Sequence, residues 1–581
     1  MQPVDLTVVR AICAELQADW VPARFEQAYQ RDRYTVAIAL RTMQGRRWLD
    51  LAWHPQAARV CQAEPPPRGA DGYSFSDQLR HQLGGLALST VIMLEPWERV
   101  LDFQFARRPG EAPLWHLYVE IMGKYSNVVL TDARQQIVTA AYQVGSQRSS
   151  LRQVQTGQPY APPPALTDTI PNADESFERW QERLALVPGQ LKRQLLTNYR
   201  GVSPLLAEEL AIAAELEPQT PTDRLELPQW EALFTAWQNW LQILTEAKFQ
   251  PARRAGGGFS VLGWEASATP VESILKLLDR YYRDRLASTT FSQLHQQLQQ
   301  KLASNLKKLQ QKAEGFRDRL QQSDAADVHR QQADLLMAHL HLWQPGLKAM
   351  TLADFATGEP VKIRLNPEKN AVQNAQSFYK QHQKLKRARA AVEPLLASVN
   401  AEIDYLENSY LALERLEAYQ SWDDLSTLTE IRDELIEQGY LPNPRNSSRP
   451  NSEETPPICH HSPSGYEILV GRNNNQNDRL SFRVAAEQDL WFHAQEIPGA
   501  HVLLRLEPGA APDDRDLQVA ADLAAFHSRA RQSDAVPVVY TSPKHLYKPK
   551  GAKPGMVIYQ KQTVLWGRPQ AACELPSSEE A

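Results

Sequence analysis

Apolar and polar positions alternate in short runs over the first 160 residues. Residues 35–40, 48–53, 99–105, 114–120 and 127–131 are rich in β-branched, aromatic and leucine side chains between turn-forming residues. Runs of this length and composition are typical of β-strands. Helix-like stretches lie between them, so residues 1–160 are predicted to form one α+β domain. The prolines at 162–164 end it, because proline interrupts both sheets and helices.

Residues 175–245 have the pattern of a small helical unit. One helix is predicted to stop near Gly201. Ser203 and Pro204 should cap and begin the next, because proline suits the first helical position. This is a helix-hairpin-helix layout. Backbone N–H groups at such a glycine turn can bind a phosphate, but many helix pairs with this turn are purely structural, and that reading is favoured here.

Two long stretches within residues 272–420 carry apolar side chains at three- and four-residue steps. In the first stretch they include Leu294, Leu298, Leu302, Leu306 and Leu309, and the second runs from about 375 to 418. Surrounded by Gln and Lys, such stripes predict long two-faced helices. With a compact insert at 343–374 between them, the two helices should form an antiparallel coiled-coil arm. Pro394 should kink the second helix.

Composition limits the partners and the location. A formal net charge of -5 means that any RNA-binding surface is a local patch. The polar, proline-rich residues 441–457 predict a linker, and 458–570 a final α+β domain. Without a signal peptide or an apolar run of about 18 residues, we expect a cytoplasmic protein that makes no membrane contact. The four cysteines form no CxxC pair, so neither a disulfide framework nor a metal site is expected.

The final domain has the densest polar signals. Residues 471–478, GRNNNQND, combine amides with an arginine, and residues 541–568 hold no acid while lysines interleave with tyrosines and Trp566. Lysines neutralise phosphates, and aromatic faces stack on unpaired bases. A basic hairpin that is merely solvated is the alternative. The predicted RNA-binding residues are Arg472, Asn473, Asn474, Asn477, Asp478, Trp491, His493, His501, Lys544, Lys548, Lys550 and Lys553.

Acid–base chemistry is a competing interpretation of Asp489, His493 and His501. However, no serine or cysteine nucleophile with a recognisable elbow lies nearby, and the chain has no Walker or GxGxxG loop. The two histidines can equally orient a backbone or contact RNA. We therefore expect a binding protein rather than an enzyme, with no catalytic residue, cofactor, metal or small-molecule substrate.

Several motifs resemble the NFACT family. The segments GRNNNQNDRL, DLWFHAQEIPGAHV and YKPKGAKPGMVIY are similar to its C-terminal RNA-binding module. Residues 120–127 resemble the EIMG-x-x-SN signature of its N-terminal domain, and residues 374–386 resemble the start of its second coil helix. The resemblance covers essentially the whole chain in the right order. It implies an N-terminal domain similar to formamidopyrimidine-DNA glycosylase without its lyase chemistry.

The resemblance also implies partners. Family members of this type recognise a stalled large (50S) ribosomal subunit, and hence 23S rRNA, while it carries peptidyl-tRNA. They recruit alanyl-tRNA and act with a small RNA-binding protein, RqcP, to add template-free alanine tails that mark the chain for proteolysis. The tRNA-binding residues implied here are Glu98, Arg99, Glu120, Lys124 and Asn127.

One position departs from the family pattern. The tailing factors carry an Asp-Arg pair where this chain has Glu98 and Arg99. Glutamate keeps the charge but extends the carboxylate by one carbon–carbon bond, which bears on tRNA selection because charge-assisted contacts depend on geometry. A surface ion pair at the start of a strand is the structural alternative.

Two other functions are weighed against this one. An older family name suggests a surface adhesin that binds fibronectin, but no secretion signal or anchor is visible. The glycosylase-like domain suggests a DNA-repair enzyme. Such an enzyme uses a proline amine that is exposed when the initiator methionine is removed, and here Gln2 precedes Pro3.

Overall fold

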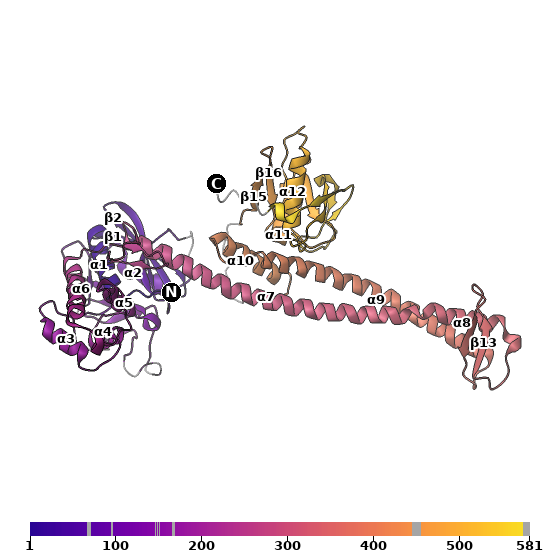
Figure 1. The fold of residues 1–581 in the computed structure, drawn as a ribbon, viewed down its shortest axis with the longest axis horizontal. Helices are drawn as coiled ribbons and strands as arrows, with labels where there is room; N and C mark the ends of the chain where they lie inside the picture. Colours follow the sequence, from indigo (N-terminus) through magenta and orange to yellow (C-terminus); the bar gives the residue numbers. More distant parts are fainter. Residues whose placement is uncertain are drawn as a thin grey trace. The chain divides into compact units, whose positions relative to one another are not determined.

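The computed structural model describes residues 1–66, 71–94, 97–145, 147, 149, 152–164, 169–443 and 455–572. The chain divides into two compact units, Met1–Leu286 and Ala287–Ala581. Each unit is mixed α/β and has its own hydrophobic cores (Figure 1). Among the described residues, no helix is both long and apolar enough to span a bilayer.

A nine-stranded antiparallel sheet dominates the first unit. Its order is β4-β3-β2-β1-β5-β6-β7-β8-β9, so two meanders meet where β1 pairs with β5. Helices α1 (Leu6–Asp19) and α2 (Ser74–Leu83) bury their apolar faces in the same core as the sheet. The strands are β1 Ala23–Asp32, β2 Thr35–Thr42, β3 Gly45–Ala52, β4 Arg59–Ala63, β5 Ala87–Met93, β6 Val100–Ala106, β7 Trp115–Glu120, β8 Asn127–Asp132 and β9 Ile137–Ala140. The five predicted strands are confirmed as β2, β3, β6, β7 and β8.

A helical unit follows, consisting of α3 (Phe177–Ala185), α4 (Leu191–Asn198), α5 (Pro204–Ala213) and α6 (Leu227–Glu246). Its core is built from Trp180, Trp230, Trp237 and Trp240. The predicted turn between α4 and α5 is confirmed. Gly201 has a φ of 82°, and the Ser203 hydroxyl accepts a hydrogen bond from the Leu206 N–H at 3.0 Å. A three-stranded sheet comes next, with β10 (Ala252–Arg253) between β11 (Phe259–Ser260) and β12 (Thr269–Pro270).

Helix α7 (Ile274–Asp324) begins close to residue 272, where the arm was predicted to start, but its first turns do not belong to the arm. Its first turns bury Ile274, Leu275, Leu278 and Tyr282 in the core of the nine-stranded sheet. The reason is that these apolar residues recur at the one-turn spacing of a core-facing helix. The arm predicted from residue 272 therefore begins as a core element of the first unit.

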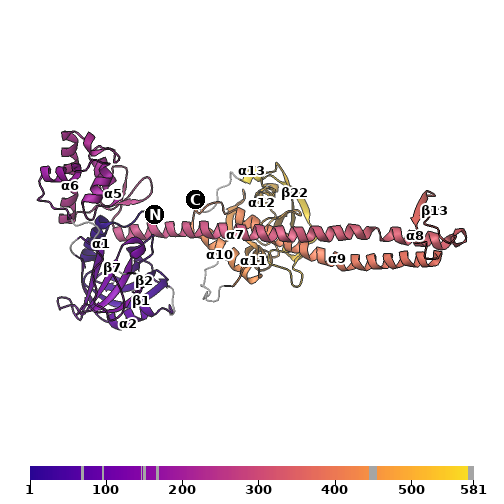
Figure 2. The same ribbon diagram turned by 90° about the horizontal axis from the view of Figure 1, so that it is seen from below.

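In the second unit the remainder of α7 runs antiparallel to α9 (Ala371–Glu414), as Figures 1 and 2 show. Phe291, Leu298 and Leu302 of α7 pack with Leu406 and Leu413 of α9, which confirms the predicted stripes. Helix α9 remains helical through Pro394. Helix α10 (Trp422–Glu437), which the sequence reading missed, joins this core.

The predicted insert holds a hairpin, β13 (Ala349–Ala353) paired with β14 (Pro360–Arg364). It packs against a further helix, α8 (Ala326–Ala338), and the start of α9. Residues 444–454, most of the predicted linker, lie outside the described residues.

The final domain is built on a six-stranded antiparallel sheet of order β15-β16-β18-β17-β19-β22. Helix α12 (Asp514–Phe526) covers one face, and α11 (Asn474–Arg479) with the π-helical turn η4 (Leu480–Val484) contributes to the other. The strands are β15 Ile458–His461, β16 Glu467–Val470, β17 Leu490–Ala494, β18 Val502–Leu504, β19 Val536–Thr541 and β22 Thr563–Gly567. A separate hairpin pairs β20 (Leu546–Tyr547) with β21 (Ile558–Tyr559), and α13 (Pro569–Ala572) follows β22.

Candidate RNA-binding surfaces

Glu98 and Arg99 line a cavity of about 300 Å³ together with residues of the turn between α4 and α5. Trp97, just before them, has a φ of 54° and packs against Trp240 of α6 with ring centroids 5.7 Å apart. A side chain at Gly201 would meet the Trp97 ring at 2.9 Å, so only glycine fits this turn. The sheet and the helical unit thus hold residues 97–99 between them.

Arg200 supplies the guanidinium nearest to the Glu98 carboxylate. The closest N–O distance is 3.5 Å, and the two side chains are 14% and 13% exposed. Burial raises the pKa of Glu98, while Arg200 and Arg99 oppose that rise. Burial lowers the pKa of Arg99, which Asp5 and Glu98 counteract. The cavity therefore presents guanidinium donors and a carboxylate acceptor, groups suited to base edges and phosphates.

Asp5 lies at the base of this cavity. Its carboxylate accepts hydrogen bonds from the Ser203 hydroxyl at 2.5 Å and from the Val8 N–H at 3.0 Å. It therefore caps α1 and at the same time joins that helix to the start of α5. Burial raises the pKa of Asp5, and the bonds from Ser203 and Val8 oppose the rise. Sequence reasoning missed Asp5 because its partner is 198 residues away.

The residues of the signature at 120–127 differ in exposure: Glu120 and Asn127 are buried, and Lys124 is exposed. Glu120 is 1% exposed and accepts hydrogen bonds from Arg152 and Tyr160, each at 2.9 Å. Asn127 is 3% exposed, and its amide bonds to the backbone of Tyr142 in both directions. Lys124 is exposed, with its ammonium 5.0 Å from the Tyr125 ring. Of these three predicted tRNA contacts, Lys124 alone presents its charged group to solvent.

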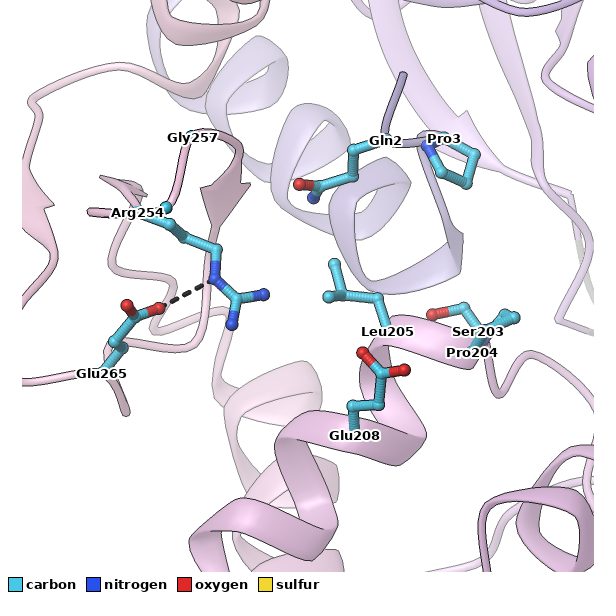
Figure 3. Close-up of a pocket in the computed structure, with 10 residues that line it drawn as sticks. Gln2, Pro3, Ser203, Pro204, Leu205, Glu208, Arg254, Gly257 and Glu265 are labelled. Carbon is cyan, nitrogen blue, oxygen red and sulfur yellow. Dashed lines mark hydrogen bonds and ion pairs between the residues drawn. The ribbon is translucent and has the colours of Figure 1, made fainter. Parts of the chain in front are cut away.

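A second cavity, of about 560 Å³, lies beside the first and shares Pro3, Ser203 and Pro204 with it. In Figure 3 it is bordered by the N-terminal residues, the first turns of α5 and the loop that carries Arg254 and Glu265. The Arg254 guanidinium bonds to Glu265 at 2.8 Å and lies 3.7 Å from Glu209. Burial raises the pKa of Glu209 to about 7.

In the final domain, side-chain amides make bonds inside the protein at Asn473, Asn474, Gln476 and Asn477. Asn473 caps α11 and donates to Glu430 of α10 at 2.7 Å. Asn474 donates to Ser409 of α9 at 2.9 Å and to Glu434 of α10 at 3.0 Å. These bonds dock α11 on the long helices. Asn473 and Asn474 were predicted to contact RNA directly. Their side chains are only 2% and 4% exposed, so the internal bonds leave little of either amide accessible to RNA.

A buried hydrogen-bonded cluster lies in the interior of the final domain and contains Asn477, His501 and Trp491. The Asn477 side-chain oxygen accepts from the His501 N–H at 3.0 Å, and the Ser481 hydroxyl bonds the His501 ring at 2.7 Å and the Trp491 indole N–H at 3.0 Å. Burial lowers the pKa of His501 to about 3 and that of His493 to about 4. Both rings are therefore neutral near pH 7. Within the described residues, no cluster of three or more His, Cys, Asp and Glu side chains is placed to hold a metal ion.

Some of the predicted basic residues bond to other groups of the protein, and others are exposed to solvent. Lys548 pairs with Asp478, whose carboxylate also accepts from the Gly555 N–H at 2.9 Å. Lys553 bonds the Tyr440 hydroxyl and lies 4.8 Å from the Tyr405 ring. The Arg472 guanidinium donates to the Pro456 carbonyl at 3.0 Å. In contrast, Lys544 and Lys550 are exposed.

The same surfaces belong to regions shared with known proteins. Residues 5–454 match the NFACT N-terminal and middle domains, and residues 458–561 match the NFACT protein RNA binding domain. The chain belongs to the NFACT family. It is 30% identical over 571 residues, 96% of both chains, to "Rqc2 homolog RqcH" of Bacillus subtilis. It is also 30% identical to the protein of that name from Streptococcus suis, over 95% of both.

Two further likenesses cover parts of the chain. Over 103 residues the chain is 30% identical to "Coiled-coil domain-containing protein 25" of Bos taurus, which covers 17% of this chain and 49% of that protein. Among solved structures, the C-terminal part of the fibronectin/fibrinogen-binding protein from Streptococcus suis is 33% identical. It covers 48% of this chain and 95% of that one, with a TM-score of 0.37. The family likeness supports RNA binding and a coiled coil for this chain.

Proposed function

We propose that this protein is a ribosome quality-control factor that binds stalled large ribosomal subunits carrying peptidyl-tRNA. The observation that carries the proposal is the likeness to the RqcH proteins, which extends over 96% of the chain rather than one domain. A match of that extent includes the tRNA-facing candidates of the first unit and the RNA-binding domain of the second. The partners proposed are 23S rRNA, peptidyl-tRNA, alanyl-tRNA and RqcP.

The finer step proposed is recruitment of alanyl-tRNA for template-free alanine tailing of the nascent chain. Arg99 and Arg200 line the cavity at the turn between α4 and α5, where guanidinium groups suit tRNA phosphates or base edges. Glu98, in place of the family aspartate, lies against Arg200. The carboxylate of Glu98 thus has a basic neighbour across the cavity. This supports the proposal that the tRNA-binding site is kept despite the change from aspartate to glutamate.

The protein is proposed to act without catalytic residues of its own. Peptide-bond formation belongs to the ribosome, and the chain's part is to hold and orient tRNA. The neutral His493 and His501 support this view, and the His501 ring is buried and bonds to Ser481 inside the final domain. A cytoplasmic, ribosome-associated location goes with the proposal.

Sucrose-gradient sedimentation of lysates from cells with stalled translation tests the proposal. The protein should migrate with free large subunits, and nascent chains from those subunits should carry C-terminal alanine extensions by mass spectrometry. Migration with large subunits without extensions would retain the stall-binding function and refute the tailing step. Absence from every ribosomal fraction would refute both, and surface exposure in protease shaving of intact cells would then favour the adhesin.

A further inference from the structure

Among the residues that the structure describes, β22 is an edge strand of the sheet in the final domain. It terminates the strand order and pairs with β19 on one side, with Val564 opposite Val539 and Trp566 opposite Pro537. Alternate residues point to opposite faces. Gly567 lies against Ala521 of α12, where a side chain would come within 2.4 Å of the Ala521 carbonyl. Val564 and Trp566 therefore face away from α12.

These two side chains are unusually exposed for apolar residues on a sheet. Val564 is 46% exposed and Trp566 is 63% exposed. On this face the half-buried Pro537 lies beside Trp566. Val539, opposite Val564, is 0% exposed because it packs with Trp491 and Leu546. The exposed apolar surface is therefore a narrow platform at the edge of the sheet, made of Val564, Trp566 and Pro537.

Basic residues flank the platform. Lys561 lies two residues before β22, and Arg568 immediately follows the strand. The Gln560 N–H donates a hydrogen bond to the His545 carbonyl at 3.1 Å, so Lys561 and Lys544, which adjoin these two residues in the chain, are brought together on the surface. A five-residue strand is about 16 Å long, so cations bracket Val564 and Trp566 over the length of a few nucleotides.

We propose that β22 is a stacking platform for unpaired RNA bases, with Trp566 under one base and Lys544 and Lys561 at the neighbouring phosphates. Aromatic faces and cations in this order are the chemistry that binds single-stranded nucleic acid without sequence preference. The proposal rests on the proposed function in that it assumes an RNA partner. It adds a surface beyond residue 561, where the match to the family's RNA binding domain ends.

A peptide strand that adds to the sheet edge is the rival occupant. One observation disfavours it: the Trp566 carbonyl already accepts a hydrogen bond from the Gln518 amide at 2.8 Å. Strand addition depends on free backbone groups along the edge. The adjoining run of residues 541–568, which lacks acids and holds six lysines and arginines, also favours a polyanion.

Fluorescence anisotropy of the full-length protein with a labelled oligouridylate tests the platform. Because stacking on one aromatic side chain contributes about 1–3 kcal/mol per base, W566A should weaken binding by about fivefold or more. W566F, which keeps an aromatic face, should retain most of the affinity. A blunt-ended RNA duplex of equal charge should bind W566A and the wild type alike.

Trp422 provides a matched control. It is 61% exposed, close to the 63% of Trp566, but lies in the first turn of α10 beside Asp423 and Asp424. W422A should bind the oligonucleotide like the wild type. Equal affinity of W566A and the wild type for the oligouridylate would overturn the proposal, as would an equal loss of duplex binding. Unchanged RNA binding with loss of a co-purifying protein would assign β22 to a peptide strand instead.

The test separates this proposal from the proposed function. If W566A still migrates with large subunits but has lost oligonucleotide binding, both proposals stand, since other contacts hold the ribosome. If W566A binds the oligonucleotide like the wild type and the protein still migrates with large subunits, only the platform is refuted. If the wild type is absent from ribosomal fractions, the proposed function fails whatever Trp566 does.

Discussion

Replacement of Asn474 by alanine should loosen the final domain from the long helices. The Asn474 amide donates to Ser409 and to Glu434, and Glu434 also accepts from the Tyr405 hydroxyl at 2.7 Å and the Asn475 N–H at 3.2 Å. Glu434 is 3% exposed, and burial raises the pKa of its carboxyl group. N474A therefore removes one of the donors around a buried acid, which water cannot easily replace.

The size of the effect follows from the two bonds lost. A hydrogen bond to a charged group contributes about 1.5–3 kcal/mol, and one between neutral groups about 1 kcal/mol. N474A should thus raise the equilibrium constant for local opening by about 60-fold or more, because 1.4 kcal/mol corresponds to a factor of ten. Hydrogen exchange with mass spectrometry measures this on the full chain, in peptides that cover α10 and α11.

Two comparisons make the experiment decisive. N475A removes a neighbouring side chain but keeps the backbone N–H that donates to Glu434, so exchange in α10 and α11 should stay close to wild type. The hairpin of β13 and β14 lies in a separate core and should be unchanged in both variants. Equal exchange of N474A and N475A would refute the reasoning that these bonds dock the domain.

Three further predictions concern charge. R200Q removes the guanidinium 3.5 Å from Glu98 and should weaken tRNA binding by about tenfold in filter assays, with R200K retaining most of it. Burial raises the pKa of Glu209 to about 7 in the folded state, compared with 4.5 in the unfolded chain. Between these two pH values the folded state keeps the proton on Glu209 and the unfolded state releases it. Stability should fall by up to about 3 kcal/mol as pH rises from 4.5 to 7, and E209Q should abolish that slope in urea denaturation. K550A should lower the slope of log affinity against log salt by about one, and K548A, whose ammonium pairs with Asp478, should lower it less.

Local pattern was enough to predict much of the fold. The strands β2, β3, β6, β7 and β8 were predictable because each is a short apolar run between turn residues. The cap at Ser203 and the stripes of the long helices have equally local signals. The start of α7 was misassigned because the same spacing suits a coiled coil and a helix buried against a sheet.

The candidate sites were less accessible to sequence reasoning. The amides near residue 474 were recognised as polar, but their partners Glu430 and Glu434 lie 40 or more residues away along the chain. Arg200 was not predicted as a site residue, because its ion pair with Glu98 forms only when the helical unit packs on the sheet. Trp566 was noticed for its chemistry, and its exposure became visible only once β22 was seen to terminate the sheet.

The most direct test of the account is to isolate the tagged protein from growing cells and sequence the bound RNA, with individual tRNAs distinguished. The account predicts enrichment of 23S rRNA together with alanine tRNA, and loss of the tRNA in an R99A variant that keeps the rRNA. Ribosomal RNA with no selected tRNA would contradict the tailing step, and neither RNA above background would contradict the central claim.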